Sequence, residues 1–209
     1  MHIAISRNIY GIGTQLMLDI PVHHKFLLLG AFVGAMLLLD LRNPPRKRQR
    51  WQSYSFLLGV GIAGAILGIA NDLITSSLSS DYFIYFKGIE PDRQFLKNVL
   101  TLGTQAGFSG AAVGGGILLL CKPKSKPIQA LLPIVKWPFI SAIAGGIIFG
   151  TLSHLLHWPQ TFGDLDGLLT SAQAHRFHTV WLIHIGLYVG ALVGLMVISI
   201  RLCTTSKMN

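Results

Sequence analysis

Five apolar runs, separated by short polar links, dominate the pattern of hydrophobic and polar positions. A helix needs about 20 apolar residues to cross the hydrocarbon core of a bilayer, and these runs reach or approach that length. They are His24–Leu41, Ser53–Leu78, Val99–Cys121, Leu131–His157 and Phe177–Leu202. The pattern predicts an all-α membrane protein, built as a compact glycine-rich bundle of about five transmembrane helices.

Residues 1–23 precede the first run and differ from it in character. Scattered polar residues interrupt them, so they lack the unbroken apolar core of a signal peptide. We expect this segment to lie outside the cell or along the membrane interface. Residues 1–209 are then expected to form a single integral membrane domain. The composition agrees, because 51% of the residues are apolar and only 12% are charged, about half the charge of a soluble domain.

Lysine and arginine are unevenly distributed between the two sides of this threading. Eleven of the 17 fall in the link Arg42–Arg50, in and after the link that follows Cys121, or in the C-terminal tail. Because positive loops stay in the cytoplasm, we expect a multi-pass protein of the bacterial cell membrane with its N-terminus outside and its C-terminus cytoplasmic. The net charge of +9 then faces anionic lipid head groups. We expect the lipid bilayer as a partner and no nucleic acid, since the basic residues are divided among short segments.

Glycine spacing indicates how the helices pack. The last run carries Gly186, Gly190 and Gly194, one on every fourth position, and each of the other runs has a similar pair. In lipid, small residues let two helix backbones approach closely, and this contact replaces the hydrophobic force available in water. The stripes predict tight packing within the bundle. Some of them are candidate contacts with a second copy of the chain or with another membrane subunit.

The end of the second run carries the most distinctive polar residues. Asp72 is expected about two turns inside the membrane, where an ionised carboxylate needs a partner. Asp81, Tyr82 and Glu90 follow in the next link. We interpret these four residues as a ligand-binding or proton-handling group at the outer leaflet. The aromatic rings from Tyr82 to Phe86 are expected at head-group depth.

The stretch Asn71–Lys87 resembles one in a family of uncharacterised, small multi-pass bacterial membrane proteins, where it reads roughly His-Asp-Gln-Ile-Thr and then Ser-Pro-Glu-Tyr-Phe. Within the last run, the stretch HIGLYVGALVG from His184 resembles the closing helix of that family, which also opens with histidine. The sequence departs from the family pattern at Asn71, Ser80 and Asp81, and the loss of a histidine at position 71 weakens a metal-binding interpretation there. The resemblance implies a similar topology and no particular activity. The matching residues are Asp72, Ile74, Thr75, Ser79, Tyr82, Phe83, Phe86 and Lys87.

Histidines gather near the same outer side. His154 and His157 share a helix face at the end of the fourth run, and His178 and His184 lie in the last run. Imidazoles together with a carboxylate are ligands for zinc, iron, copper or nickel. The sequence therefore suggests a cluster that binds a transition metal or a polar ligand. The alternative is that these histidines form structural hydrogen bonds or handle protons.

A second constellation suggests an enzyme. Gly107-Phe108-Ser109-Gly110 has the GxSG form of rhomboid-type intramembrane serine proteases, and His184 resembles the histidine in their final helix. The resemblance implies Ser109 as nucleophile and His184 as general base. Five runs rather than six, and a mid-helix position for Ser109, depart from that family. A third alternative is a non-catalytic membrane subunit or scaffold.

Overall fold

A computed structural model describes Leu38, Arg42 and residues 50–123, 126–156 and 167–207. Contacts between Cα atoms divide the chain into two compact units, Met1–Tyr54 and Ser55–Asn209, and the architecture that follows concerns the second. The segment 1–23 lies outside the described residues. So does the first predicted run, His24–Leu41, except for Leu38.

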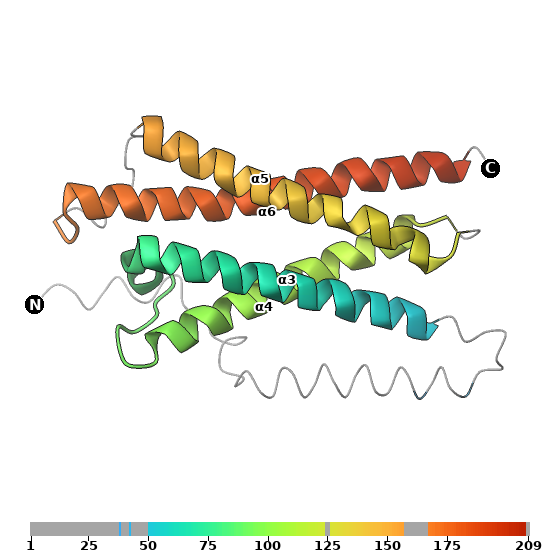
Figure 1. The fold of residues 1–209 in the computed structure, drawn as a ribbon, viewed down its shortest axis with the longest axis horizontal. Coiled ribbons are helices and arrows are strands. Elements are labelled where there is room, and N and C mark those ends of the chain that lie inside the picture. The colour runs from blue at the N-terminus through green and yellow to red at the C-terminus, as the bar shows by residue number, and fades with distance from the viewer. Residues whose placement is uncertain (1–37, 39–41, 43–49, 124–125, 157–166, 208–209) are drawn as a thin grey trace, which may run out of the picture. The chain divides into compact units, whose positions relative to one another are not determined.

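Four long helices carry the fold, and Figure 1 shows them running alternately in opposite directions. They are α3 (Arg50–Leu78), α4 (Phe95–Cys121), α5 (Leu132–Leu156) and α6 (Ser171–Lys207). A short π-helix, η3 (Tyr82–Phe86), follows α3, and a 3-10 turn, η4 (Ile128–Leu131), leads into α5. By length and composition, all four long helices are able to cross a membrane. The second to fifth predicted runs are therefore confirmed as long apolar helices.

Local hydrogen bonds explain why two helices begin earlier than the apolar runs. The α6 helix starts at Ser171 rather than Phe177, because Thr170 and Gln173 form a capping box. The Gln173 Oε1 accepts from the Thr170 backbone N–H (3.0 Å), and the Thr170 hydroxyl accepts from the Gln173 N–H (3.4 Å). Before α4, the Asp92 carboxylate accepts from the Gln94 N–H at 2.8 Å. These hydrogen-bonded turns lie before the apolar runs, and they lengthen α4 and α6 at their N-terminal ends.

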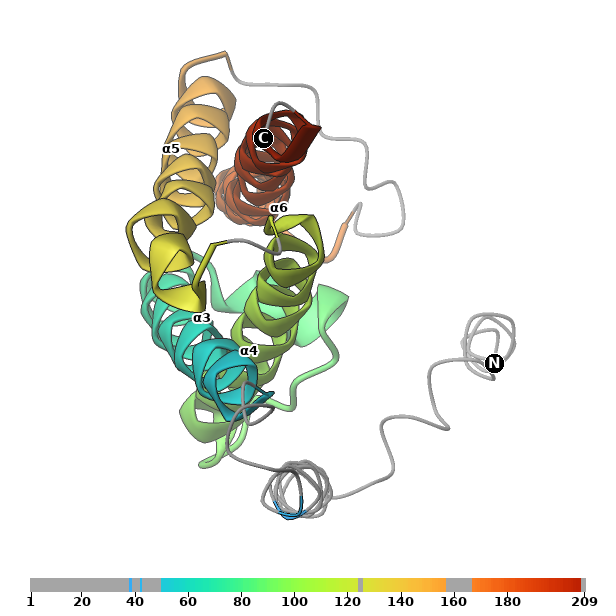
Figure 2. The same ribbon diagram turned by 90° about the vertical axis from the view of Figure 1, so that its right-hand side faces the viewer.

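The α5 and α6 helices are in backbone contact, and Figure 2 shows them side by side. A Cβ atom built on Gly186 would lie 2.3 Å from the carbonyl oxygen of Gly145, and one on Gly190 would lie 2.1 Å from that of Ser141. No side chain fits at such distances. The packing predicted from the glycine spacing of the last run is therefore present within this pair.

The α3 and α4 helices make a second crossing of the same kind. A Cβ on Gly64 would lie 2.3 Å from the Gly107 carbonyl oxygen, and one on Gly68 would lie 2.1 Å from that of Gly103. The crossing thus depends on two glycines from each helix. Because only backbone fills the contact, the two helix axes approach closely at this point.

Two hydrophobic clusters close the ends of the second unit. Near the start of α3 the buried residues are Phe56, Val60, Leu118, Leu131 and Ile198. At the opposite end lies the aromatic core, formed by Tyr82, Phe83, Val99, Phe177 and Val180.

The aromatic core changes one expectation for the η3 rings. Tyr82 and Phe83 are 1% and 0% exposed, whereas Tyr85 and Phe86 are 47% and 50% exposed. Head-group depth stays a prediction, but the first two rings do not lie on the surface. They turn inward because η3, which begins after residues 79–81, packs against α6.

Candidate functional site

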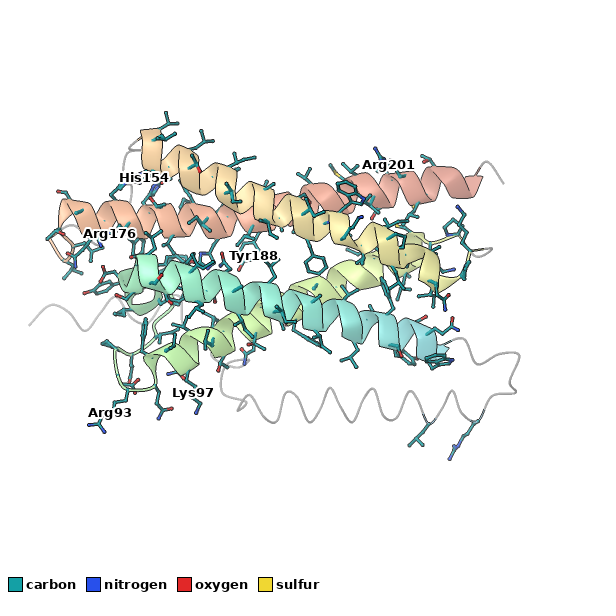
Figure 3. The ribbon with its side chains drawn as sticks, in the orientation of Figure 1. Arg93, Lys97, His154, Arg176, Tyr188 and Arg201 are labelled. Carbon is teal, nitrogen blue, oxygen red and sulfur yellow. The ribbon has the colours of Figure 1, made fainter. Side chains whose placement is uncertain are left out.

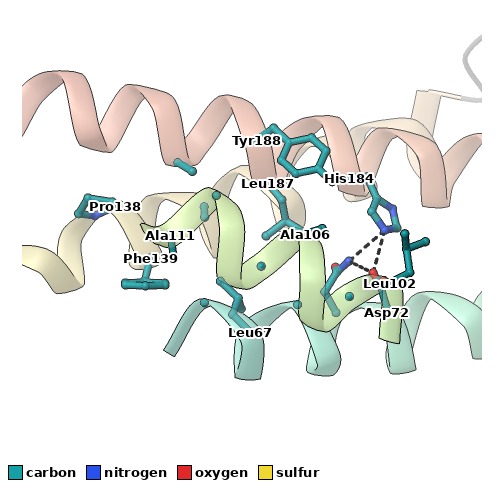
Figure 4. A pocket seen from close by; sticks show the side chains of 18 of the residues that line it. Leu67, Asp72, Leu102, Ala106, Ala111, Pro138, Phe139, His184, Leu187 and Tyr188 are labelled. Atoms are coloured by element: carbon teal, nitrogen blue, oxygen red, sulfur yellow. Dashed lines mark hydrogen bonds and ion pairs between the residues drawn. The ribbon is translucent and has the colours of Figure 1, made fainter. Parts of the chain in front are cut away.

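A buried pair of titratable side chains joins α3 to α6. Asp72 Oδ1 lies 3.1 Å from His184 Nε2, and each residue is 6% exposed. The Asn71 side-chain amide lies 3.0 Å from Asp72 Oδ1 and 3.1 Å from His184 Nε2. Figure 4 shows Asp72 and His184 meeting at one end of a pocket. We call Asn71, Asp72 and His184 the polar triad.

The hydrogen bonds of His184 constrain where protons lie in the triad. His184 Nδ1 is 2.8 Å from the Val180 carbonyl oxygen, which only accepts, so Nδ1 carries hydrogen and donates. The Asn71 amide has two N–H groups, and these reach both Asp72 Oδ1 and a bare His184 Nε2, each of which accepts. A protonated Nε2 would instead donate to Asp72 Oδ1. In either form the polar atoms of the buried pair have hydrogen-bond partners, which lowers the cost of burying them.

Aromatic rings cover His184 from the η3 side. The Tyr82 ring stacks on the imidazole with centroids 4.8 Å apart and planes at 23°. Phe83 approaches the same imidazole edge-on at 6.1 Å. Burial, assisted by Tyr188 and Asp72, raises the pKa of the Tyr82 hydroxyl above its usual range. Tyr82 therefore stays a neutral phenol, and its ring shields the triad.

A glycine on α4 makes room for the carboxylate. A Cβ on Gly103 would lie 2.8 Å from Asp72 Oδ2 and 2.6 Å from the Gly68 carbonyl oxygen. Gly103 thus serves both the α3–α4 crossing and the space around Asp72. The position of the carboxylate depends on the absence of a side chain from the neighbouring helix.

The triad borders a cavity of about 190 Å³ between the four helices (Figure 4). Lys87 and Tyr188 add the other polar groups of the lining. The rest is small or apolar and consists of Gly64, Leu67, Gly68, Leu102, Gly103, Ala106, Gly107, Gly110, Ala111, Pro138, Phe139, Ala142, Leu187 and Ala191. The cavity is therefore apolar along most of its lining and polar where the triad lies.

Lys87 lies beside this polar end. Its ammonium is 5.6 Å from the centre of the Tyr82 ring and 5.1 Å from that of Phe86, distances at which an aromatic face attracts a cation. Partial desolvation lowers the pKa of Lys87, and the Asp72 carboxylate opposes that shift. The Lys87 side chain is exposed, and its amine lines the cavity beside the triad.

The other histidines form separate contacts. His154 Nδ1 lies 3.4 Å from His175 Nε2, and the Ser153 hydroxyl lies 3.2 Å from His178 Nδ1. Figure 3 shows His154 near the end of α5. The structure brings His184 to Asp72, but neither His154 nor His178 joins that pair through these contacts.

A metal centre at the histidines stays a prediction. Across residues 50–123, 126–156 and 167–207, no group of three or more His, Cys, Asp or Glu residues is arranged to hold a metal ion. His157 was predicted as a ligand and, with the neighbouring Asp164 and Asp166, lies outside the described residues. The contacts of His154, His178 and His184 are those of hydrogen-bonded side chains.

The two remaining acidic residues of the predicted group lie elsewhere. Asp81 lines a separate polar groove formed by the serines at the end of α3 and by Thr170, Gln173 and Arg176. Glu90 is exposed in the turn before α4. Of the four residues interpreted as one group, Asp72 and Tyr82 therefore contact His184, while Asp81 and Glu90 do not line the cavity.

The candidate nucleophile lies apart from its expected base. Ser109 is exposed, and its hydroxyl donates to the Gln105 carbonyl oxygen at 2.6 Å. The ring nitrogens of His184 are engaged by Val180, Asp72 and Asn71. Ser109 is two positions beyond Gly107, which faces α3, so helical geometry turns Ser109 away from the crossing. The hydrogen bond that the protease mechanism requires is not formed.

Sequence reasoning missed four residues of the site. Asn71 was noted only as a departure from a histidine, although its amide bonds both members of the pair. Lys87 appeared only as a match to the family pattern, and Tyr188 carried no signal beyond its polarity. Gly103 appeared only as a packing residue, and its role beside Asp72 depends on which helix faces α3.

Comparison with protein-family models, with curated proteins and with solved structures finds no match to this chain. The resemblances to the small bacterial membrane proteins and to the rhomboid-type proteases therefore stay predictions. The argument for function relies on the triad and the cavity.

Proposed function

We propose that this chain is a multi-pass protein of the cell membrane that binds a small amphipathic molecule between its helices. Four long apolar helices support the membrane assignment. The excess of Lys and Arg near the start of α3, the end of α4 and the end of α6 supports a cytoplasmic position for that end. The triad then belongs to the extracytoplasmic half, with the N-terminus outside and the C-terminus in the cytoplasm.

The observation that carries this proposal is an apolar cavity with a buried Asp72–His184 pair at one end. Binding pockets for small molecules are largely apolar and have a few convergent polar groups that orient the ligand. A molecule with a hydrocarbon body and a polar head matches that division. The body would lie along the glycines and alanines of α3 and α4, and the head would lie beside the triad.

The geometry favours binding over the other candidate functions. A protease needs Ser109 beside His184, and both side chains have other partners. A non-catalytic scaffold has no use for a carboxylate buried beside a cavity, which is costly in a membrane protein. A transition metal is the alternative ligand for the histidines, and it would be found by elemental analysis of the purified protein and of a His154→Ala, His184→Ala double variant.

Native mass spectrometry of the detergent-purified protein tests the proposal. The wild type is expected to retain one amphipathic molecule per chain after purification, or after incubation with excess dodecanol or dodecanoate. Ala106→Leu adds three carbons to the cavity lining on α4 and is expected to abolish retention, because the new side chain fills the space of the ligand. Ala144→Leu is the matched control, since Ala144 is exposed on α5 and does not line the cavity.

Circular dichroism shows whether both variants keep their helices. Retention by Ala106→Leu equal to that of the wild type would contradict binding in this cavity. A wild type that takes up neither dodecanol nor dodecanoate would contradict the proposal as a whole.

A further inference from the structure

Charged side chains in the cavity lining restrict which head groups a ligand can have. Among the described lining residues, Asp72, Lys87 and His184 are those able to carry charge near neutral pH. Asp72 and His184 are paired with each other at 3.1 Å. Lys87 is the basic group of the lining that has no acidic partner of its own among the described residues.

Lys87 makes no ion pair that would cancel its charge. In the described part of the chain, the contact between Asp72 and His184 is the sole pairing of a basic with an acidic side chain within 4.0 Å. The Lys87 ammonium instead lies over the Tyr82 and Phe86 rings. The Lys87 side chain is exposed, so its ammonium is accessible to the head group of a ligand in the cavity that it lines. The polar end of the cavity is thus suited to a head group with a single negative charge.

The apolar part of the cavity indicates the shape of the rest of the ligand. Its lining extends along α6 from His184 to Ala191, a rise of about 10 Å. The volume of about 190 Å³ exceeds that of an engineered cavity of about 150 Å³ that holds benzene. Glycine and alanine from α3 and α4 form most of one wall, and Leu187 and Phe139 form part of the other. This space suits one hydrocarbon chain rather than a broad ring system.

We propose that the ligand is a single-chain carboxylate, with its head between Lys87 and the polar triad and its chain directed toward Pro138 and Ala191. The proposal rests on the proposed function and adds the charge and class of the molecule. Lys87 supplies the countercharge, and the Asn71 amide supplies a hydrogen-bond donor at the same end. A neutral head would leave the Lys87 charge without a partner, and a cationic head would be repelled by it.

A comparison of three amphipaths with the same chain tests this inference. Dodecanoate, dodecanol and dodecylamine are titrated against the full-length wild type by native mass spectrometry, above the pKa of the free carboxylic acid. We expect dodecanoate to bind about tenfold more tightly than dodecanol, as for a hydrogen bond to a charged group, and dodecylamine to bind most weakly. Lys87→Gln is expected to remove the preference for the carboxylate, so that dodecanoate and dodecanol bind with similar affinity.

Lys97→Gln is the matched control. Lys97 is exposed near the start of α4, close to the same end of the molecule, and does not line the cavity (Figure 3). This variant should keep the wild-type preference. Equal binding of carboxylate and alcohol by the wild type, or an unchanged preference in Lys87→Gln, would overturn the inference while leaving cavity binding intact. Failure of all three amphipaths to bind would overturn the proposed function as well.

Discussion

The two helix pairs use the same backbone contact over different lengths. Between α5 and α6 the contact continues along several turns. Cβ atoms built on α6 at Gly186, Gly190 and Gly194 would each lie within 2.3 Å of an atom of α5. Between α3 and α4 the close contact is confined to two steps, Gly64 with Gly107 and Gly68 with Gly103. Beyond those steps, Phe108 extends over Gly61 and holds the helices further apart.

This difference separates the two roles of glycine in the molecule. A long stripe joins α5 and α6 along much of their length and leaves little space between them. A short crossing brings α3 and α4 together at one point and contributes four glycines to the cavity lining. Glycine spacing alone therefore does not distinguish a closed helix interface from the wall of a binding site.

The largest expected effect follows from breaking the longer interface. Gly186→Val places a branched side chain where even a Cβ would lie 2.3 Å from the Gly145 carbonyl oxygen. Overpacking of this kind costs about 3 kcal/mol at the upper end of its usual range, so we expect loss of folded protein. The fraction of monodisperse protein in size-exclusion chromatography, together with the thermal unfolding midpoint, measures this.

Gly116→Ala provides the control for that experiment. Apart from its chain neighbours and the backbone of its own helix, nothing lies within 4 Å of a Cβ built on Gly116. The stability of the Gly116→Ala variant should therefore match that of the wild type. A Gly186→Val protein as stable as Gly116→Ala would show that the α5–α6 contact is not a backbone contact.

An intermediate effect is expected where the two helix pairs are joined. His184→Leu leaves the Asp72 carboxylate buried without its partner, and removing one member of a buried pair costs about 3 kcal/mol. Asp72→Asn should cost about 1 kcal/mol, because the new amide donates to His184 Nε2 and keeps a hydrogen bond between α3 and α6. Urea unfolding in mild detergent gives both free energies. Equal losses in the two variants would contradict the difference expected between an unpaired carboxylate and a paired amide.

The smallest effect is expected at the second histidine contact. His154 is exposed on α5 and pairs with His175, which is half-buried, at 3.4 Å. His154→Ala should change the free energy of unfolding by no more than about 0.5 kcal/mol, as for other surface positions. The same unfolding assay applies, with His184→Leu as the positive control. A loss as large as that of His184→Leu would indicate that the His154 contact stabilises the fold.

Sequence patterns predicted where the helices lie along the chain better than which helices pack against one another. Hydropathy located α3 to α6 because each is long and apolar. It placed the start of α6 too late, since the capping box at Thr170 and Gln173 is polar. Asp72 and His184 were both recognised as site residues, yet their pairing was not predictable. Pairing depends on the order of helices around the bundle, and a hydropathy pattern does not encode that order.

Tyr82 illustrates a second limit of the sequence. An aromatic residue after a membrane helix is usually read as an interfacial ring, and the same pattern fits Tyr85 and Phe86, which are exposed. Tyr82 turns inward because the chain continues as a π-helix, which shifts the side-chain register relative to an α-helix. No sequence pattern predicts the direction in which the Tyr82 side chain points in this π-helix. Its stacking on His184 is therefore known only from the structure.

The short distance between Asp72 and His184 would have a consequence in the energised membrane that we propose for this protein. A transmembrane voltage does work of about 2.3 kcal/mol per elementary charge for each 100 mV crossed. A proton that moves between the Asp72 carboxylate and the His184 imidazole crosses only one hydrogen bond. Voltage would therefore exert little force on such a transfer.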